Sequence, residues 1–203
     1  MILGINTACQ PFSIAVICHK TGLLLQEKTF QSTHQQSENF ITEIEKLGSL
    51  QNIKAIGITQ GPGGYTGLRL GITTAKTIAQ VLNIPLYGLS TLEALIQNPI
   101  GDSTTIVSIP ATKHELNVAL FLTKLGQYKR LSRDFTCTTN EFQKIIHKFK
   151  IPPTLITPPT HHIRAETLAT YAKTCLDKNQ EGPYLKINPI YSHLPNLGKL
   201  PKP

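Results

Sequence analysis

A glycine-rich turn between a strand pattern and a helix pattern is the feature that most constrains the fold of this chain. The stretch from Ile58 to Leu82 reads ITQGPGGYTGLRLGITTAKTIAQVL. Glycine tolerates positive φ and lets other atoms approach the backbone closely, and the first turn of the following helix offers unpaired N–H groups at its positive end. The first candidate binding or docking site is therefore this turn, which consists of Gly61, Pro62, Gly63, Gly64, Tyr65, Thr66 and Gly67.

Two familiar phosphate-binding patterns fail on these residues. A Walker-type loop requires Lys and then Ser or Thr directly after its last glycine, but Gly67 is followed by Leu-Arg. A dinucleotide fingerprint requires a third glycine where this turn has Thr66, and an acid about twenty residues further on. No Asp or Glu occurs between Glu45 and Glu93. A tight turn that binds no ligand stays open as the alternative.

Two helix patterns, over residues 37–47 and 66–82, carry apolar stripes at helical spacing. Small residues in the second stripe allow another helix to come near, either inside the fold or from a partner. Both readings stay open from the spacing alone. The stripes consist of Phe40, Ile41, Ile44 and Leu47, and of Leu68, Ile72, Ala75 and Ala79.

The net charge of +8 is concentrated in the second half of the chain. The first hundred residues hold six Lys/Arg and five Asp/Glu, whereas the remainder holds fourteen and seven. Lys124, Lys129, Arg130 and Arg133 cluster around an expected hairpin, and Lys144, Lys148 and Lys150 follow on an expected helix. Such a distribution suits a polyanion such as tRNA, or a plain solvated surface.

The positions of turn-forming residues between the strand and helix patterns predict two lobes. Strands are expected at residues 2–6, 12–18, 22–30, 53–59 and 85–88, then at 104–109, 115–125 and 127–135, with further helices at 139–149 and 162–176. The break at Asn-Pro-Ile-Gly-Asp, residues 98–102, divides an N-terminal lobe (1–99) with the glycine turn and both stripes from a C-terminal lobe (100–203) with the basic surface. The tail after Glu181 is rich in proline and should be extended.

The chain reads as a cytoplasmic protein with no membrane contact. No apolar run reaches the roughly eighteen residues of a membrane span, and the opening MILGINTACQ reads as a strand rather than a signal peptide. The four cysteines show no C-x-x-C spacing, which favours reduced thiols over a zinc or disulfide site. Cys9 would be reactive only beside a basic residue, and none is near in sequence. Ser90 and Glu93 predict a helix capping box.

The run GPGGYTGLRLGITTAKTIAQVLNIPLYGLSTLEAL resembles the TsaB (YeaZ-like) family, the dimerisation subunit of the bacterial tRNA threonylcarbamoyladenosine machinery. In that family a GPGSFTG-like loop, an R-x-G-x-x-x-A-K helix and an IP-x-x-G-x-S-S-L-E-A segment follow one another. The opening ILGINTACQPFSIAV and the helix QSENFITEI are similar to that family's first hairpin and its HSE-x-LLP-x-I helix. The resemblance covers about the first ninety-six residues, and a P-x-Y echo follows at Pro189-Ile190-Tyr191.

The resemblance implies an α/β fold of two lobes, of the actin-like and hexokinase-like (ASKHA) type, with mixed sheets flanked by helices. It implies a non-catalytic subunit that forms a heterodimer with TsaD and supports threonylcarbamoyl transfer to adenosine 37 of tRNAs that read ANN codons. TsaE joins this complex, tRNA is reached through it, and ATP or ADP would bind at the level of the complex. The two stripes would then form a helix bundle across the subunit boundary.

Three departures from the family's pattern bear on chemistry. Asn6, Gln36 and Pro110 stand where the family often has Asp, His and Asp, and Asn supplies no charge to a magnesium ion. We expect no catalytic residue and no metal site in this chain. The candidate contacts to a nucleotide or a partner are Asn6, Thr7, Arg69 and Lys76.

Three alternatives stay open. The chain could be a stand-alone metallopeptidase or an ATP-dependent transferase on the same fold, which predicts turnover without a partner. It could bind tRNA through its basic second lobe. The isolated chain could also form a homodimer through the same helices.

Overall fold

The structure is a computed structural model that describes residues 1–30, 40–97, 99, 101–158 and 161–192. Its strands are β1 (Ile2–Asn6), β2 (Phe12–Ile17), β3 (Leu24–Phe30), β4 (Ala55–Gly61), β5 (Leu86–Ser90), β6 (Ser103–Pro110), β7 (Glu115–Lys124), β8 (Gln127–Arg130), β9 (Phe135–Thr138) and β10 (Thr154–Ile156). Its helices are α1 (Phe40–Lys46), α2 (Tyr65–Leu82), α3 (Thr91–Leu95), α4 (Thr139–His147) and α5 (Ala165–Asp177), with short 3-10 helices η1 (Leu50–Asn52) and η2 (Tyr184–Lys186). The α/β class expected from the sequence is confirmed.

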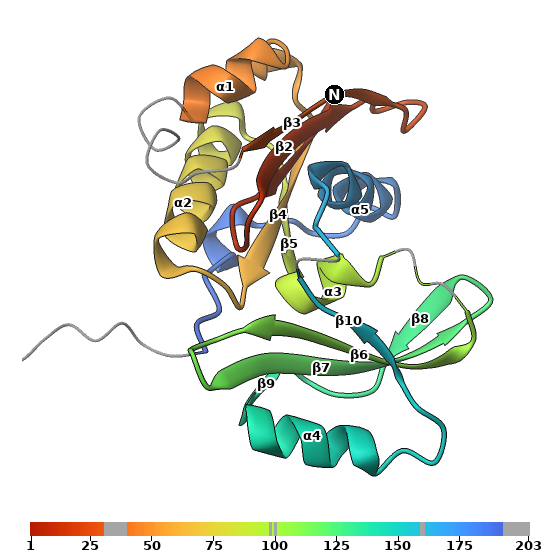
Figure 1. Cartoon of the computed structure of the whole chain (residues 1–203). Coiled ribbons are helices and arrows are strands. Elements are labelled where there is room, and N and C mark those ends of the chain that lie inside the picture. Colours follow the sequence, from red (N-terminus) through yellow and green to blue (C-terminus); the bar gives the residue numbers. More distant parts are fainter. Residues whose placement is uncertain (31–39, 98, 100, 159–160, 193–203) are drawn as a thin grey trace, which may run out of the picture.

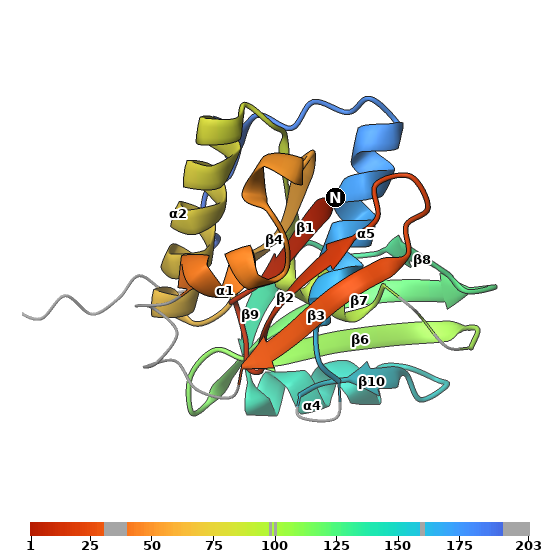
Figure 2. The same cartoon turned by 90° about the horizontal axis from the view of Figure 1, so that it is seen from above.

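The first sheet has the strand order β3-β2-β1-β4-β5. β1, β2 and β3 are antiparallel neighbours, whereas β4 and β5 run parallel to β1. Helices α1 and α2 cover one face and α5 covers the other (Figures 1 and 2). Every residue of β1 and β2 is buried, which explains why these strands read as nearly continuous apolar runs.

The second sheet has the order β10-β6-β7-β8, and β9 pairs with β7. Helix α3 lies between the two sheets and α4 packs on the outer face of the second sheet (Figure 1). The α3 side holds a core around Leu92, Ile96 and Phe121. The α4 side holds a separate core around Val118 and Phe142. In the part of the chain that the structure describes, no helix has the length and apolarity to cross a bilayer.

After building the second sheet, the chain returns to the first. Helix α5 packs against β1, β4 and β2. This contact depends on glycine, because a Cβ atom at Gly4 would stand 1.9 Å from the carbonyl oxygen of Ala165, and one at Gly57 would stand 2.0 Å from that of Leu168. The lobe division expected at residues 99 and 100 stays a prediction; it separates the strands of the two sheets in sequence, and α5 crosses back over it.

Two expected elements differ from the observed ones. The single strand expected over residues 127–135 is two strands, β8 and β9, joined by a loop in which the backbone N–H of Leu131 donates to Leu120 O at 2.8 Å. The helix expected over residues 37–47 is described over Phe40–Lys46. Residues 37–39 lie outside the described residues, as do His34 and Gln36.

Candidate functional site

The glycine turn connects the carboxyl end of β4 to the first turn of α2. Gly61 has φ of +110°, a value that disfavours any residue with a side chain. Gly64 is the N-cap of α2, and its backbone N–H donates to Ala8 O at 2.8 Å. The turn is thus tied to the loop between β1 and β2, which lies against it.

Close packing inside the chain explains why this turn is rich in glycine. A Cβ atom at Gly67 would stand 2.1 Å from Thr7 O and 2.7 Å from Cζ of Phe12, and one at Gly63 would stand 2.3 Å from Ala8 O. The sequence predicted close approach by another molecule. In the structure the approaching backbone at both glycines is the chain's own β1–β2 loop.

Asn6 holds that loop together. Its side-chain Nδ2 donates to Cys9 O at 3.2 Å and to Pro11 O at 3.1 Å. Its Oδ1 accepts from the backbone N–H of Ala8 at 3.3 Å and from Oγ1 of Thr59 at 3.4 Å. The side chain is fully buried, and these four bonds use its whole hydrogen-bonding capacity. The candidate contact predicted at Asn6 is therefore an internal one.

Thr7 is equally buried and packs on α2. A Cβ atom at Gly71 would stand 2.1 Å from Oγ1 of Thr7. Among the described residues, this hydroxyl has no hydrogen-bond partner. Thr7 thus faces the second turn of α2 rather than a surface that a nucleotide can reach.

Arg69 forms a hydrogen bond within α2, whereas Lys76 reaches a segment far away in sequence. Nη1 of Arg69 donates to the hydroxyl of Tyr65 at 2.6 Å, and its guanidinium lies 5.1 Å from the centre of that ring. The Tyr65 ring lies 5.0 Å from the ring of Tyr191. Nζ of Lys76 donates to Ile187 O at 3.0 Å. Both predicted cations therefore interact with residues that bind or belong to the C-terminal segment, which we define as residues 182–192.

The C-terminal segment lies along the first lobe beside the turn. The backbone N–H of Ile190 donates to Gln60 O at 2.7 Å, and that of Leu86 donates to Gly182 O at 3.0 Å. The carbonyl oxygen of Ile190 would lie 2.3 Å from a Cβ atom at Gly61. Sequence reasoning treated this tail as an extended end. The sequence signal that could have indicated this contact was the short P-x-Y match at residues 189–191, because its tyrosine, Tyr191, packs on Tyr65.

A cleft of about 630 Å³ opens between the turn, the β1–β2 loop and the second sheet. Among the described residues, no side chain that lines it carries a formal charge. The lining residues are Ala8, Cys9, Gln10, Phe12, Gly63, Gly64, Tyr65, Thr66, Gly67, Leu70, Ile109, Pro110 and Pro158. Burial raises the pKa of the Cys9 thiol to about 11, so Cys9 is protonated at neutral pH and is a poor nucleophile. The described residues contain no cluster of three or more His, Cys, Asp or Glu that could hold a metal ion.

The predicted partner-helix stripes require a correction. Seven of the eight residues are at most 8% exposed and belong to one core cluster: Phe40, Ile44, Leu47, Leu68, Ile72, Ala75 and Ala79. Only Ile41, at 48% exposure, faces outward. Periodicity identifies an apolar face but not what covers it, and here the first sheet does so. The outer sides of these helices carry other residues, including Val81 at 77% exposure.

A polar network between α3 and the second sheet was missed from the sequence. Nη1 of Arg130 donates to Oε2 of Glu93 at 2.8 Å, and Nη2 forms an ion pair with Asp134. Oγ of Ser90 donates to Oδ2 of Asp134 at 2.8 Å, and no side-chain cap bond forms at Ser90. The hydroxyl of Tyr128 donates to Oε1 of Glu93 at 3.1 Å. The capping box predicted at Ser90 and Glu93 is therefore wrong, because both side chains bind across to the other sheet.

Comparisons with known proteins identify the family. The family model described as "TsaD: tRNA N6-adenosine threonylcarbamoyltransferase" matches residues 38–154. The tRNA threonylcarbamoyladenosine biosynthesis protein TsaB of Bacillus subtilis (strain 168) is 48% identical over 48 residues, which are 24% of this chain and 21% of that protein. TsaB of Buchnera aphidicola subsp. Schizaphis graminum is 29% identical over 102 residues, 48% of this chain and 47% of that protein. The aligned stretches thus span from about a fifth to about half of these relatives.

The likeness in structure covers almost the whole chain. YeaZ from Pseudomonas aeruginosa has a TM-score of 0.74 at 17% identity, over 94% of this chain and 98% of that chain. This likeness shows the fold, which in the described part of the chain is an α/β arrangement of two five-stranded sheets with helices and agrees with the α/β class that the sequence resemblance implied. Because the family model covers more than half of the residues, the chain belongs to the family of that model, and its relatives in that family include proteins named TsaB.

Proposed function

We propose that this chain is a non-catalytic subunit of the machinery that makes N6-threonylcarbamoyladenosine in tRNA. It pairs with a TsaD protein and supports transfer of threonylcarbamoyl to adenosine 37 of tRNAs that read ANN codons, in a complex that TsaE also joins. The family model and the names of the TsaB relatives support the pathway. Metal binding and transfer chemistry then belong to the partner.

The observation that carries this proposal is the environment of Asn6. A catalytic member of this fold needs an acid near the first hairpin to hold a metal ion and orient a nucleophile. Here that position holds a neutral amide that is fully buried and committed to four internal hydrogen bonds. The described residues that line the nearby cleft are all uncharged. The first hairpin therefore supports the shape of the glycine turn, and the turn in turn sets the direction of α2.

The outer sides of α1 and α2 are the surface we assign to the partner. Both helices lie on the same face of the first sheet, side by side in two views (Figures 1 and 2). Ile41 of α1 is 48% exposed and Val81 of α2 is 77% exposed. Apolar side chains of this size on neighbouring helices provide anchors for a helix-on-helix contact.

The test is a binding measurement with substitutions that leave the core intact. Ile41→Glu combined with Val81→Glu should weaken the complex with purified TsaD at least tenfold in calorimetry, because charge is placed in an apolar contact. Leu23→Glu is the matched control, since Leu23 is 67% exposed and lies on the β2–β3 loop. Substitution of Ala75 is unsuitable because that residue is fully buried. Equal binding by the double variant and the wild type would contradict this interface.

Function itself is tested by reconstitution. Modification of an unmodified tRNA transcript by TsaD and TsaE with the threonylcarbamoyl-adenylate donor should stop when this chain is omitted and resume when it is restored. Turnover of ATP or a peptide by the chain alone would instead favour the stand-alone enzyme. The same preparation, run by light scattering, shows whether the isolated chain is a homodimer.

A further inference from the structure

The second sheet carries a group of lysines on the side that faces away from the first lobe. We call this surface the outer basic face. It combines residues of α4 and the segment that follows it with residues of the β7–β8 hairpin. All five of its lysines are exposed: Lys124, Lys129, Lys144, Lys148 and Lys150.

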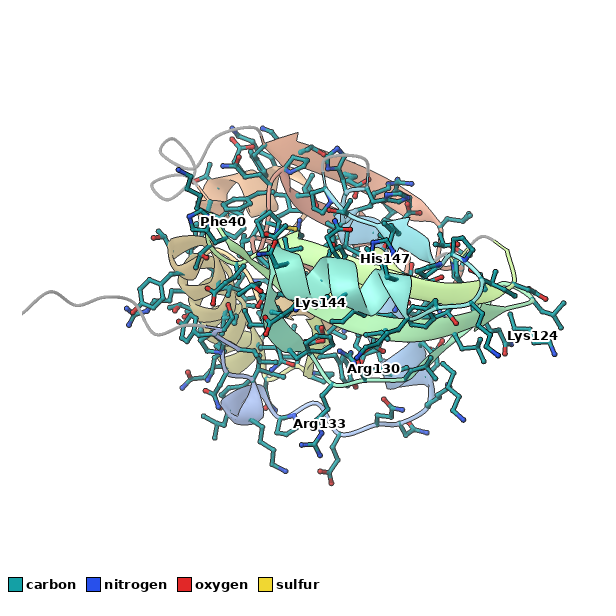
Figure 3. The ribbon with its side chains drawn as sticks, turned by 60° about the horizontal axis from the view of Figure 1, so that its bottom comes forward. Phe40, Lys124, Arg130, Arg133, Lys144 and His147 are labelled. Atoms are coloured by element: carbon teal, nitrogen blue, oxygen red, sulfur yellow. The ribbon has the colours of Figure 1, made fainter. Side chains whose placement is uncertain are left out.

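Strand register places the hairpin lysines on the α4 side of the sheet. Leu120 of β7 packs in the core cluster that α4 covers. Leu122 and Lys124 follow it at intervals of two, so they point to the same side. Lys129 of β8 is the cross-strand partner of Leu122 and therefore shares that side. Figure 3 looks onto this surface, with Lys144 and His147 on α4 in the foreground and Lys124 at the end of the sheet.

Local compensation of the positive charge on the outer basic face is weak: the pKa of Glu141 is lowered by hydrogen bonds from Thr138 and, to a smaller extent, by the charge of Lys144. Among the described residues, none of the five lysines forms an ion pair within 4.0 Å. Arg130, which the sequence grouped with them, lies on the other side of the sheet and is paired with Glu93 and Asp134. Of the nearby acids, Glu141 caps α4. The carboxylate of Asp102 accepts from Leu125 N at 2.8 Å.

We propose that the outer basic face binds RNA through its phosphate backbone, and that this RNA is the tRNA on which the complex acts. The identity of the RNA rests on the proposed function. Two observations favour RNA over other polyanions. All five lysines fall within residues 38–154, the stretch that matches a tRNA-modifying family, and α4 lies at the opposite end of the molecule from α1 and α2 (Figure 1). A partner docked on those two helices leaves the outer basic face open to a tRNA.

The test uses the full chain and a fluorescent, unmodified tRNA transcript, with binding followed by anisotropy across a range of KCl concentrations. The triple variant Lys129→Glu, Lys144→Glu, Lys148→Glu should bind at least tenfold more weakly. Its plot of log affinity against log salt should also be flatter by about 2, because each lost phosphate contact contributes roughly 0.7–0.9 to the slope. The matched control is Lys20→Glu, Lys54→Glu, Lys178→Glu, which makes the same charge change at exposed positions elsewhere. Thermal melts check that both variants are folded before binding is compared.

Four results would overturn the inference: no binding of the transcript by the wild-type chain, normal binding by the triple variant of the outer basic face, equal losses in both triple variants, or binding to phosphatidylserine-containing vesicles in place of tRNA. The readout is independent of catalysis. If the triple variant binds tRNA normally while the chain still restores modification, this inference fails and the proposed function stands. If tRNA binding is lost as expected but the wild-type chain does not support modification, the proposed function fails alone.

Discussion

Two cysteines at opposite ends of one hairpin show how strongly local surroundings decide residue chemistry. Cys9 is partly buried in the β1–β2 loop, where desolvation raises its pKa to about 11. Cys18 lies just after β2, where hydrogen bonds from the side chain and backbone N–H of Thr21, and from the backbone N–H of Lys20, lower its pKa to about 7. The sequence directed attention to Cys9, whereas the thiol with the lowered pKa is Cys18.

We predict that Cys18 is the first thiol to be alkylated. A lowered pKa means that the thiolate is populated at lower pH, so the rate with iodoacetamide should rise with pH to a half-maximal value near pH 7 and then level off. Peptide mass spectrometry after short exposures measures each site separately. The Cys18→Ser variant should lose the fast phase, and labelling of Cys9 should need far more alkaline solution. Faster labelling of Cys9 than of Cys18 at pH 7 would contradict the assignment.

At the scale of elements, the β1–β2 loop and the start of α2 behave as one packed unit. Thr7 and Ala8 contribute the backbone oxygens that lie against Gly67 and Gly63. Asn6 fixes the loop that carries those oxygens. The direction of α2 therefore depends on glycine at defined positions, which connects the glycine turn to the surface assigned to the partner.

Gly67→Ala should lower the free energy of unfolding by about 1–3 kcal/mol, the usual cost of forcing an extra methyl group into a packed region. The new Cβ atom would stand 2.1 Å from Thr7 O, a backbone atom that cannot move alone. Gly64→Ala is the control, because its Cβ atom would have only Ala8 O nearby, at 3.7 Å. Urea melts of the two variants should differ in midpoint. Equal midpoints would show that the β1–β2 loop moves to accommodate the methyl group without lowering the free energy of unfolding.

At the scale of the whole molecule, the C-terminal segment connects α2, β4 and β5 of the first lobe and packs beside the glycine turn. Lys76, Gln60 and Leu86 each form a hydrogen bond to it, and Tyr191 packs on Tyr65. Tyr184 and Ile187 pack on the main core cluster of that lobe. Residues far apart in sequence thereby stabilise the start of α2.

We expect removal of residues 184–203 to destabilise the chain and to expose the glycine turn. Hydrogen exchange should become faster for the amides of residues 60–67, because the bond between Ile190 N and Gln60 O and the Tyr65–Tyr191 contact are lost. Removal of residues 193–203 alone is the control, since it keeps every one of these contacts. Unchanged exchange in the longer deletion would mean that the segment does not support the turn.

Local patterns predicted local structure well and long-range packing poorly. Strand β1 and helix α2 follow directly from an apolar run and from helical spacing, and both lie where the sequence indicated. The burial of Ile72 and the internal bonds of Asn6 depend on what covers each residue, which spacing does not encode. Ser90 pairs with Asp134, forty-four residues away, in place of its predicted cap. The lobe boundary and the partner contact stay predictions.

Because α5 packs on the first sheet but comes late in the sequence, one face of that sheet is synthesised long before the helix that covers it. β1 ends at Asn6, and the helix that covers one of its faces begins at Ala165, about 160 residues later. At a synthesis rate of about 5–20 residues per second, roughly 8–30 s pass between the synthesis of β1 and the synthesis of the helix that covers this face. During this interval the apolar sheet of the nascent chain is exposed on one side. We therefore expect this face of the nascent chain to bind chaperones that recognise exposed apolar surface until α5 has been synthesised.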